Sequence, residues 1–124
     1  MTRTVYLNGE YVSENEAKIS VFDRGFLMAD AVYEVTSVLD GKLIDFKGHA
    51  KRLNRSLDEL DMKNPISYEE LLAVHRELVR VNYIDEGLVI YRYHADLHPT
   101  EISYIPIQMK RIQQWYYLRK TNQV

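Results

Sequence analysis

The chain has 124 residues, of which 46% are hydrophobic and 27% charged, and its formal net charge is −2. This length suits one modest domain with its own core rather than two domains. The small negative charge gives no drive toward nucleic acid or anionic membranes, and the absence of cysteine excludes disulfides, thiolate metal sites and a cysteine nucleophile. No apolar stretch reaches the ~20 residues that cross a bilayer, and the first residues lack a signal-peptide core. We therefore expect a cytoplasmic protein without a metal site.

The amino-terminal part of the chain predicts two β-hairpins. The first covers residues 5–12, with an Asn-Gly turn that tolerates positive backbone dihedral angles. The second covers residues 31–44, where a stretch rich in β-branched and aromatic side chains is followed by an Asp-Gly turn.

Two amphipathic helices and a strand are predicted next. From Lys47 to Leu60 the apolar residues recur at steps of three and four, which is the period of a helix. Asn64-Pro65 ends this helix, and a serine with an acid three residues later then begins a second helix over residues 67–82. Residues 88–91 predict a short strand. The order of these elements favours an α+β domain of antiparallel hairpins with two helices.

Several short motifs stand in register over much of the chain. They read FDRGF at residues 22–26, ADAVYEV at 29–35, DGKL at 40–43, HAKRL at 49–53 and SLDEL at 56–60. In order and spacing this series resembles the amino-terminal part of class IV aminotransferases, over residues 3–90. The amino-acid sequence of these motifs is most similar to the D-amino-acid (D-alanine) type, with branched-chain aminotransferases and aminodeoxychorismate lyase as relatives. The resemblance implies the small amino-terminal domain of that fold, with the second domain missing.

The resemblance also implies a cofactor, pyridoxal 5′-phosphate, and two site residues. Arg52 would hold the cofactor phosphate, for which a planar guanidinium is suited, and Tyr33 would line the substrate side. Without the resemblance, an arginine early in a helix is most often a solvated charge, and a tyrosine in a strand is most often packing. Asp23 and Arg24 are interpreted as a structural turn with an ion pair, and His49 as a residue of the helix start.

The catalytic lysine of the family, which forms the Schiff base, lies beyond the resemblance, and no lysine here stands in that context. We therefore expect no catalytic residue in this chain. The parent enzyme would transfer an amino group from a D-amino acid to a 2-oxo acid, and the fragment alone would be inactive. Family members are homodimers, and we expect the fragment to self-associate.

Residues 92–124 differ in composition from residues 1–91, which we interpret as the domain. All four glutamines and the single tryptophan lie in this tail, whereas all five glycines precede it. Synonymous codons exist for residues 92–120 in which a shifted frame reads VSRGFAPDRDFLYPDPNETHPTVVLFTQ, similar to the family's continuation. We therefore interpret the tail as out of frame, and expect it to leave the strand at 88–91 with an open edge. Residues 107–120 alternatively predict a short basic helix.

A different function remains open from the sequence. The chain could be a small intact module that binds a protein partner through an exposed sheet edge and the aromatic cluster at Trp115, Tyr116 and Tyr117. Nucleic-acid binding through the basic tail is disfavoured by the negative net charge.

Overall fold

The computed structural model describes residues 2–95 and, for the backbone alone, residues 101–108. Six strands and three helices occur in this part of the chain. In chain order they are β1 (Thr4–Leu7), β2 (Glu10–Ser13), α1 (Arg24–Met28), β3 (Ala31–Leu39), β4 (Lys42–Leu43), α2 (Phe46–Glu59), α3 (Tyr68–Val81), β5 (Glu86–His94) and β6 (Glu101–Gln108).

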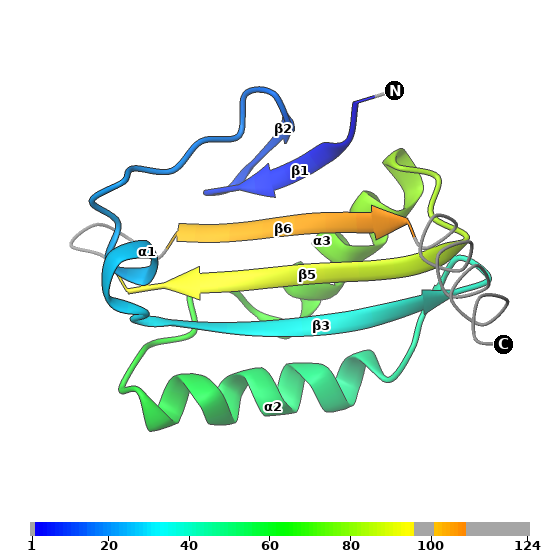
Figure 1. Cartoon of the computed structure of the whole chain (residues 1–124). Coiled ribbons are helices and arrows are strands. Elements are labelled where there is room, and N and C mark those ends of the chain that lie inside the picture. Colours follow the sequence, from blue (N-terminus) through cyan, green and yellow to red (C-terminus); the bar gives the residue numbers. More distant parts are fainter. Residues whose placement is uncertain (1, 96–100, 109–124) are drawn as a thin grey trace, which may run out of the picture.

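The strands form a single antiparallel sheet in the order β2-β1-β6-β5-β3-β4 (Figure 1). The two predicted hairpins are confirmed, and they lie at opposite edges of the sheet. The predicted strand at 88–91 is also found, but it is longer and runs to His94. The expectation that this strand has an open edge is wrong, because β5 pairs with β3 on one side and with β6 on the other. Strand β6 comes from the stretch that the sequence indicated to be a tail.

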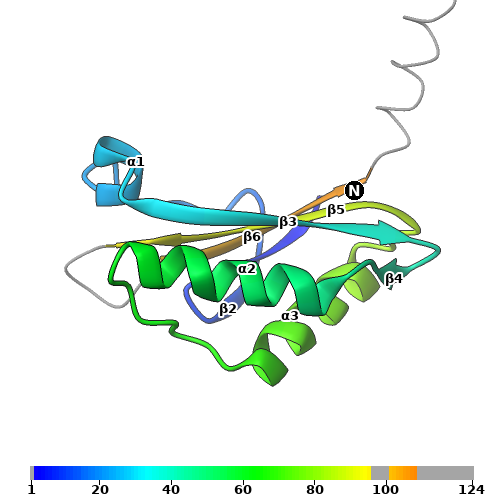
Figure 2. The same ribbon diagram turned by 90° about the horizontal axis from the view of Figure 1, so that it is seen from below.

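Both predicted long helices are confirmed, and they cover the same face of the sheet (Figure 2). Helix α2 begins after Asp45, whose carboxylate accepts the backbone N–H of Gly48. Helix α3 begins after Ser67, whose hydroxyl accepts the N–H of Glu70 at 3.2 Å, as the capping pattern predicts. These side chains satisfy backbone donors that have no partner within the helix.

The core lies between this pair of helices and the sheet. Its most buried side chains have at most 1% of their surface exposed, and burying each large one contributes about 1.5–3 kcal/mol. They are Leu53, Leu57, Leu78, Val89, Tyr91 and Tyr93. Asn82, at the end of α3, links β1 to this helix through hydrogen bonds. Its side chain accepts the backbone N–H of Thr4 at 2.8 Å and donates to the Thr4 carbonyl at 2.9 Å.

The first motif forms the short helix α1, which lies on the sheet face opposite α2 and α3 (Figure 2). The turn expected at Asp23 and Arg24 is instead the start of this helix, and Arg24 forms its ion pair with Asp30 at 2.8 Å rather than with Asp23. Asp23 is fully buried; it accepts the N–H of Phe26 at 2.9 Å and lies 2.5 Å from Nδ1 of His94. A Cβ at Gly25 would overlap the His94 ring, so only glycine fits there without rearrangement. The motif therefore docks α1 closely against β5.

No helix in residues 2–95 combines the length and the apolar character needed to cross a membrane.

Candidate functional site

A buried carboxylate lies at the centre of the candidate site. Glu34 extends from β3 toward α2, and only 4% of its side chain is exposed. Its Oε1 accepts a hydrogen bond from Nε of Arg52 at 2.5 Å, and its Oε2 accepts one from Nη2 of the same arginine at 2.8 Å. Nδ1 of His49 lies 3.0 Å from the same Oε2. Both partners come from α2, three residues apart on the helix surface, so the helix presents both to one strand residue.

The electrostatics of this cluster favour an ionised Glu34. Burial alone would raise the pKa of its carboxyl group, but hydrogen bonds from Arg52 and then His49 outweigh burial and hold the pKa below its ordinary value. The same carboxylate raises the pKa of Arg52 above its ordinary value. The cluster is therefore an ion pair at neutral pH.

One edge of the Arg52 guanidinium is hydrogen-bonded to Glu34, and much of the arginine side chain is exposed to solvent. A guanidinium has a side-on pair of donors at Nε and Nη2 and an end-on pair at Nη1 and Nη2. Glu34 occupies the side-on pair, while 64% of the arginine side chain remains exposed. Arg52 lines an open hollow of about 500 Å³ together with Tyr33, Glu34, Val35 and Ser56. This hollow lies at the outer edge of β3, where β4 pairs only with Val38 and Leu39.

The structure brings the two predicted site residues to the same hollow. Tyr33 is 65% exposed and projects from the sheet face that α2 and α3 leave uncovered, whereas the adjacent Glu34 projects into the helix side. Arg52 reaches the hollow from α2. No lysine is among the residues of the described chain that line this hollow; Lys47 and Lys51 belong to α2 but do not contribute to it.

Sequence reasoning missed Glu34, although a signal was available. The strand pattern alternates, so Val32, Glu34 and Thr36 face the same side, and this side is buried. A charged residue at an inward position of such a strand requires a partner. The arginine and histidine of the following helix are that partner.

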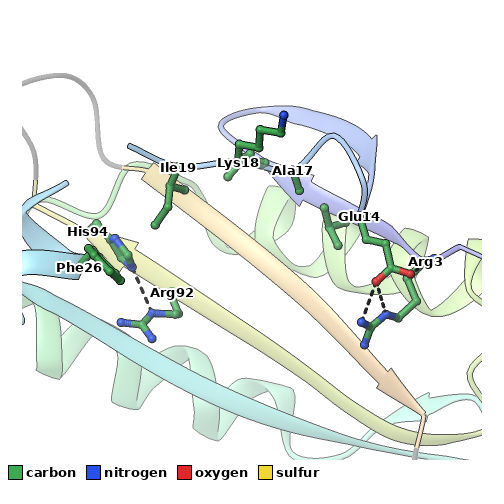
Figure 3. A pocket seen from close by; sticks show the side chains of 10 residues that line it. Arg3, Glu14, Ala17, Lys18, Ile19, Phe26, Arg92 and His94 are labelled. Carbon is green, nitrogen blue, oxygen red and sulfur yellow. Dashed lines mark hydrogen bonds and ion pairs between the residues drawn. The ribbon is translucent and has the colours of Figure 1, made fainter. Parts of the chain in front are cut away.

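A second hollow, of about 400 Å³, lies on the uncovered sheet face (Figure 3). Val5 and Leu7 of β1 line one part of it, and Arg92 and His94 of β5 line another. Nε of Arg92 donates to Nε2 of His94 at 3.1 Å, so the histidine accepts at Nε2 and donates from Nδ1 to Asp23. This hollow contains neither Tyr33 nor Arg52. The aromatic cluster at Trp115–Tyr117 and the alternative helix at 107–120, apart from the last two residues of β6, lie outside the described residues.

Comparison with known proteins agrees with the fold and the motifs. The family model described as amino-transferase class IV matches residues 31–113. D-alanine aminotransferase of Staphylococcus haemolyticus is 35% identical over 108 residues, which are 87% of this chain and 38% of that protein. A putative branched-chain-amino-acid aminotransferase of Methanocaldococcus jannaschii is 40% identical over 96 residues, which are 75% of this chain and 33% of that protein.

Solved structures show the same fold. The T.th. branched-chain amino acid aminotransferase, determined with pyridoxamine 5′-phosphate, superposes with a TM-score of 0.80 at 22% identity, over 87% of this chain and 40% of that one. The sheet and its two helices are thus those of the amino-terminal part of a class IV aminotransferase fold. The chain belongs to the class IV aminotransferase family, whose cofactor is pyridoxal phosphate. It spans about a third of the length of the curated relatives it matches, at 38% and 33%.

Proposed function

We propose that this chain is the phosphate-holding part of a D-amino-acid aminotransferase, in which Arg52 binds the phosphate of pyridoxal phosphate and Tyr33 lines the substrate side. The observation that carries the proposal is the open end-on pair of donors of Arg52, beside an exposed Tyr33. Phosphate oxygens and a planar guanidinium make parallel charge-assisted hydrogen bonds. The similarity to D-alanine aminotransferases supports the choice of substrate class.

The residues present fit the cofactor phosphate. The arginine is fixed by a buried carboxylate, yet it keeps donors in an exposed position where a dianion can approach. When bound, pyridoxal phosphate supplies an electron sink for the bonds at the substrate's α-carbon. The chain's own residues contribute an anion contact at Arg52 and, from the Tyr33 phenol, a hydrogen-bond donor together with a flat ring surface.

Catalysis of amino-group transfer also requires a lysine near the cofactor, and none lines the hollow in the described residues. We therefore propose that this 124-residue chain alone does not transfer amino groups, and that amino acids and 2-oxo acids are substrates of the longer enzyme. We propose further that the enzyme acts as a homodimer, as its family resemblance implies.

Binding of the phosphate can be measured without any reaction. The dissociation constants of pyridoxamine 5′-phosphate and of pyridoxamine are compared by calorimetry for the full chain and for Arg52→Ala. The ratio of the two constants isolates the phosphate contribution. We expect the chain to prefer the phosphorylated ligand by on the order of tenfold and Arg52→Ala to lose this preference.

Arg55→Ala is the matched control, because Arg55 lies in the same helix and, among residues 2–95, its only ion pair is with the exposed Glu59. It removes the same charge from the protein and should keep the preference. An equal loss in both variants would mean that the phosphate responds only to net charge, and Arg52 would then have no particular role.

A further inference from the structure

We infer that Glu34 is a positioning residue for the phosphate site: it orients the Arg52 guanidinium so that the end-on donors face the hollow. This inference rests on the proposed function. The carboxylate binds the side-on hydrogens of the guanidinium, at Nε and Nη2, and projects to the helix side of β3, so its effect on a ligand at the end-on edge acts through the arginine.

The geometry fixes rotations that an exposed arginine would otherwise make freely. Two hydrogen bonds from one guanidinium edge to the two oxygens of one carboxylate set both the plane and the direction of the fork. The carboxylate itself is fixed in turn, because it is buried and its Oε2 is held by His49. A ligand at the opposite edge therefore meets donors that are already aligned, and it does not have to order the side chain itself.

The negative charge of Glu34 also weakens phosphate binding, which is opposite to the effect of aligning Arg52. Glu34 carries a full negative charge, which repels a phosphate dianion and offsets part of the attraction of Arg52. The two effects predict opposite outcomes when the charge is removed. Alignment is expected to dominate, because the carboxylate lies behind the guanidinium and is neutralised by it, whereas an unheld arginine on an exposed helix surface samples many rotamers.

Three variants separate alignment from charge. Glu34→Gln removes the charge and keeps the shape, while Glu34→Asp keeps the charge and shortens the reach. Glu59→Gln is the matched control, because it removes a carboxylate from the exposed Arg55 pair on the same helix. The amide NMR spectrum and the unfolding midpoint establish that each variant is folded.

Two measurements are made on each protein. The first is the side-chain NMR signal of Arg52 at Nε, where a held guanidinium shows slow proton exchange and slow rotation about its Nε–Cζ bond. The second is the dissociation constant of pyridoxamine 5′-phosphate. We expect both Glu34 variants to lose the slow rotation and to bind roughly tenfold more weakly, and Glu59→Gln to match the unchanged chain in both measurements.

Unchanged Arg52 dynamics in Glu34→Gln would overturn the inference, and so would tighter ligand binding by this variant, because charge would then dominate. Failure of the proposed function has a different signature. In that case the unchanged chain and Arg52→Ala bind the ligand equally, while the NMR measurement still decides whether Glu34 orders the arginine.

Discussion

His75 is a buried base whose protonation should make the fold sensitive to acid. It lies on α3 with no exposed surface, edge-on to the rings of Phe46 and Tyr91 at centroid distances of 5.0 and 4.6 Å. Its Nδ1–H donates to the carbonyl of Leu71 at 2.8 Å. Burial lowers the pKa of His75 from 6.5 to about 4, and the hydrogen bond to Leu71 only partly offsets this shift.

The direction of the effect follows from where the proton binds. In the unfolded chain His75 binds a proton near pH 6.5, whereas the folded chain resists protonation until the pH is near 4. The free energy of unfolding therefore has its full value, as far as His75 is concerned, above pH 6.5, and it decreases as the pH falls from 6.5 to 4. Such a shift costs about 2 kcal/mol at pH 5 and about 3 kcal/mol below pH 4. This is a large part of the ~5–15 kcal/mol that stabilises a typical domain.

The assay is denaturant unfolding at pH 7, 6 and 5 of the unchanged chain and of His75→Phe. Phenylalanine keeps an aromatic ring between Phe46 and Tyr91 but cannot take up a proton. Carboxylates titrate in both proteins, so the difference between the two pH profiles reports on His75. We expect the unchanged chain to lose about 2 kcal/mol more than the variant between pH 7 and pH 5. If the unfolding free energies of the two proteins changed in parallel with pH, the reasoning would be refuted. As a control, His49→Gln should still lose more stability than His75→Phe between pH 7 and pH 5.

Two predictions concern the carboxyl-terminal part of the chain. Removing residues 96–124 deletes β6, which pairs with eight residues of β5 and two of β1. At a net ~1 kcal/mol per hydrogen bond, the lost free energy of unfolding approaches the whole stability of a small domain. Circular dichroism of the shortened chain should therefore show no cooperative thermal transition. A midpoint equal to that of the full chain would contradict this. We also propose that residues 92–124 are encoded out of frame, so that sequencing the gene across the codons for residues 85–124 should show a second frame spelling the family's continuation; a gene without such a frame would exclude it.

These two predictions are compatible because strand pairing uses the backbone. Any extended segment with free N–H and C=O groups can complete the ladder between β1 and β5, whether or not its side chains were selected for that place. Pro106, which pairs with Val89 in the middle of β6, has no N–H to donate. Proline is rare in the interior of a sheet, which supports a segment that was not selected as a central strand.

The local elements could be predicted because their signals are local. The turn dipeptides, the capping serine and the apolar periods of α2 and α3 each act within a few residues, and the structure has these elements where the patterns indicate them. Strand β6 could not be predicted in this way. Residues 101–108 lie in the stretch whose composition indicated a tail, and their strand conformation depends on β1 and β5, which are distant in sequence.

The candidate site shows the same division. The family motifs predict Arg52 and Tyr33 as site residues, while their common hollow depends on the packing of α2 against β3. The contact between Asp23 and His94 spans 71 residues, and no local pattern indicates it. The ion pair of Arg24, in contrast, is formed with Asp30, only six residues away in the next motif.

The Tyr33-Glu34 dipeptide explains why the site depends on strand register. Successive side chains of a strand point to opposite faces, so the tyrosine faces the uncovered side while the glutamate holds Arg52 on the helix side. A slip of β3 by one residue would exchange these directions, exposing the carboxylate and forcing the phenol into the core. Nine register pairs with β5, from Ala31 opposite His94 to Leu39 opposite Glu86, resist such a slip. The sheet that forms the core therefore also determines which of two neighbouring side chains faces the uncovered side and which one holds Arg52.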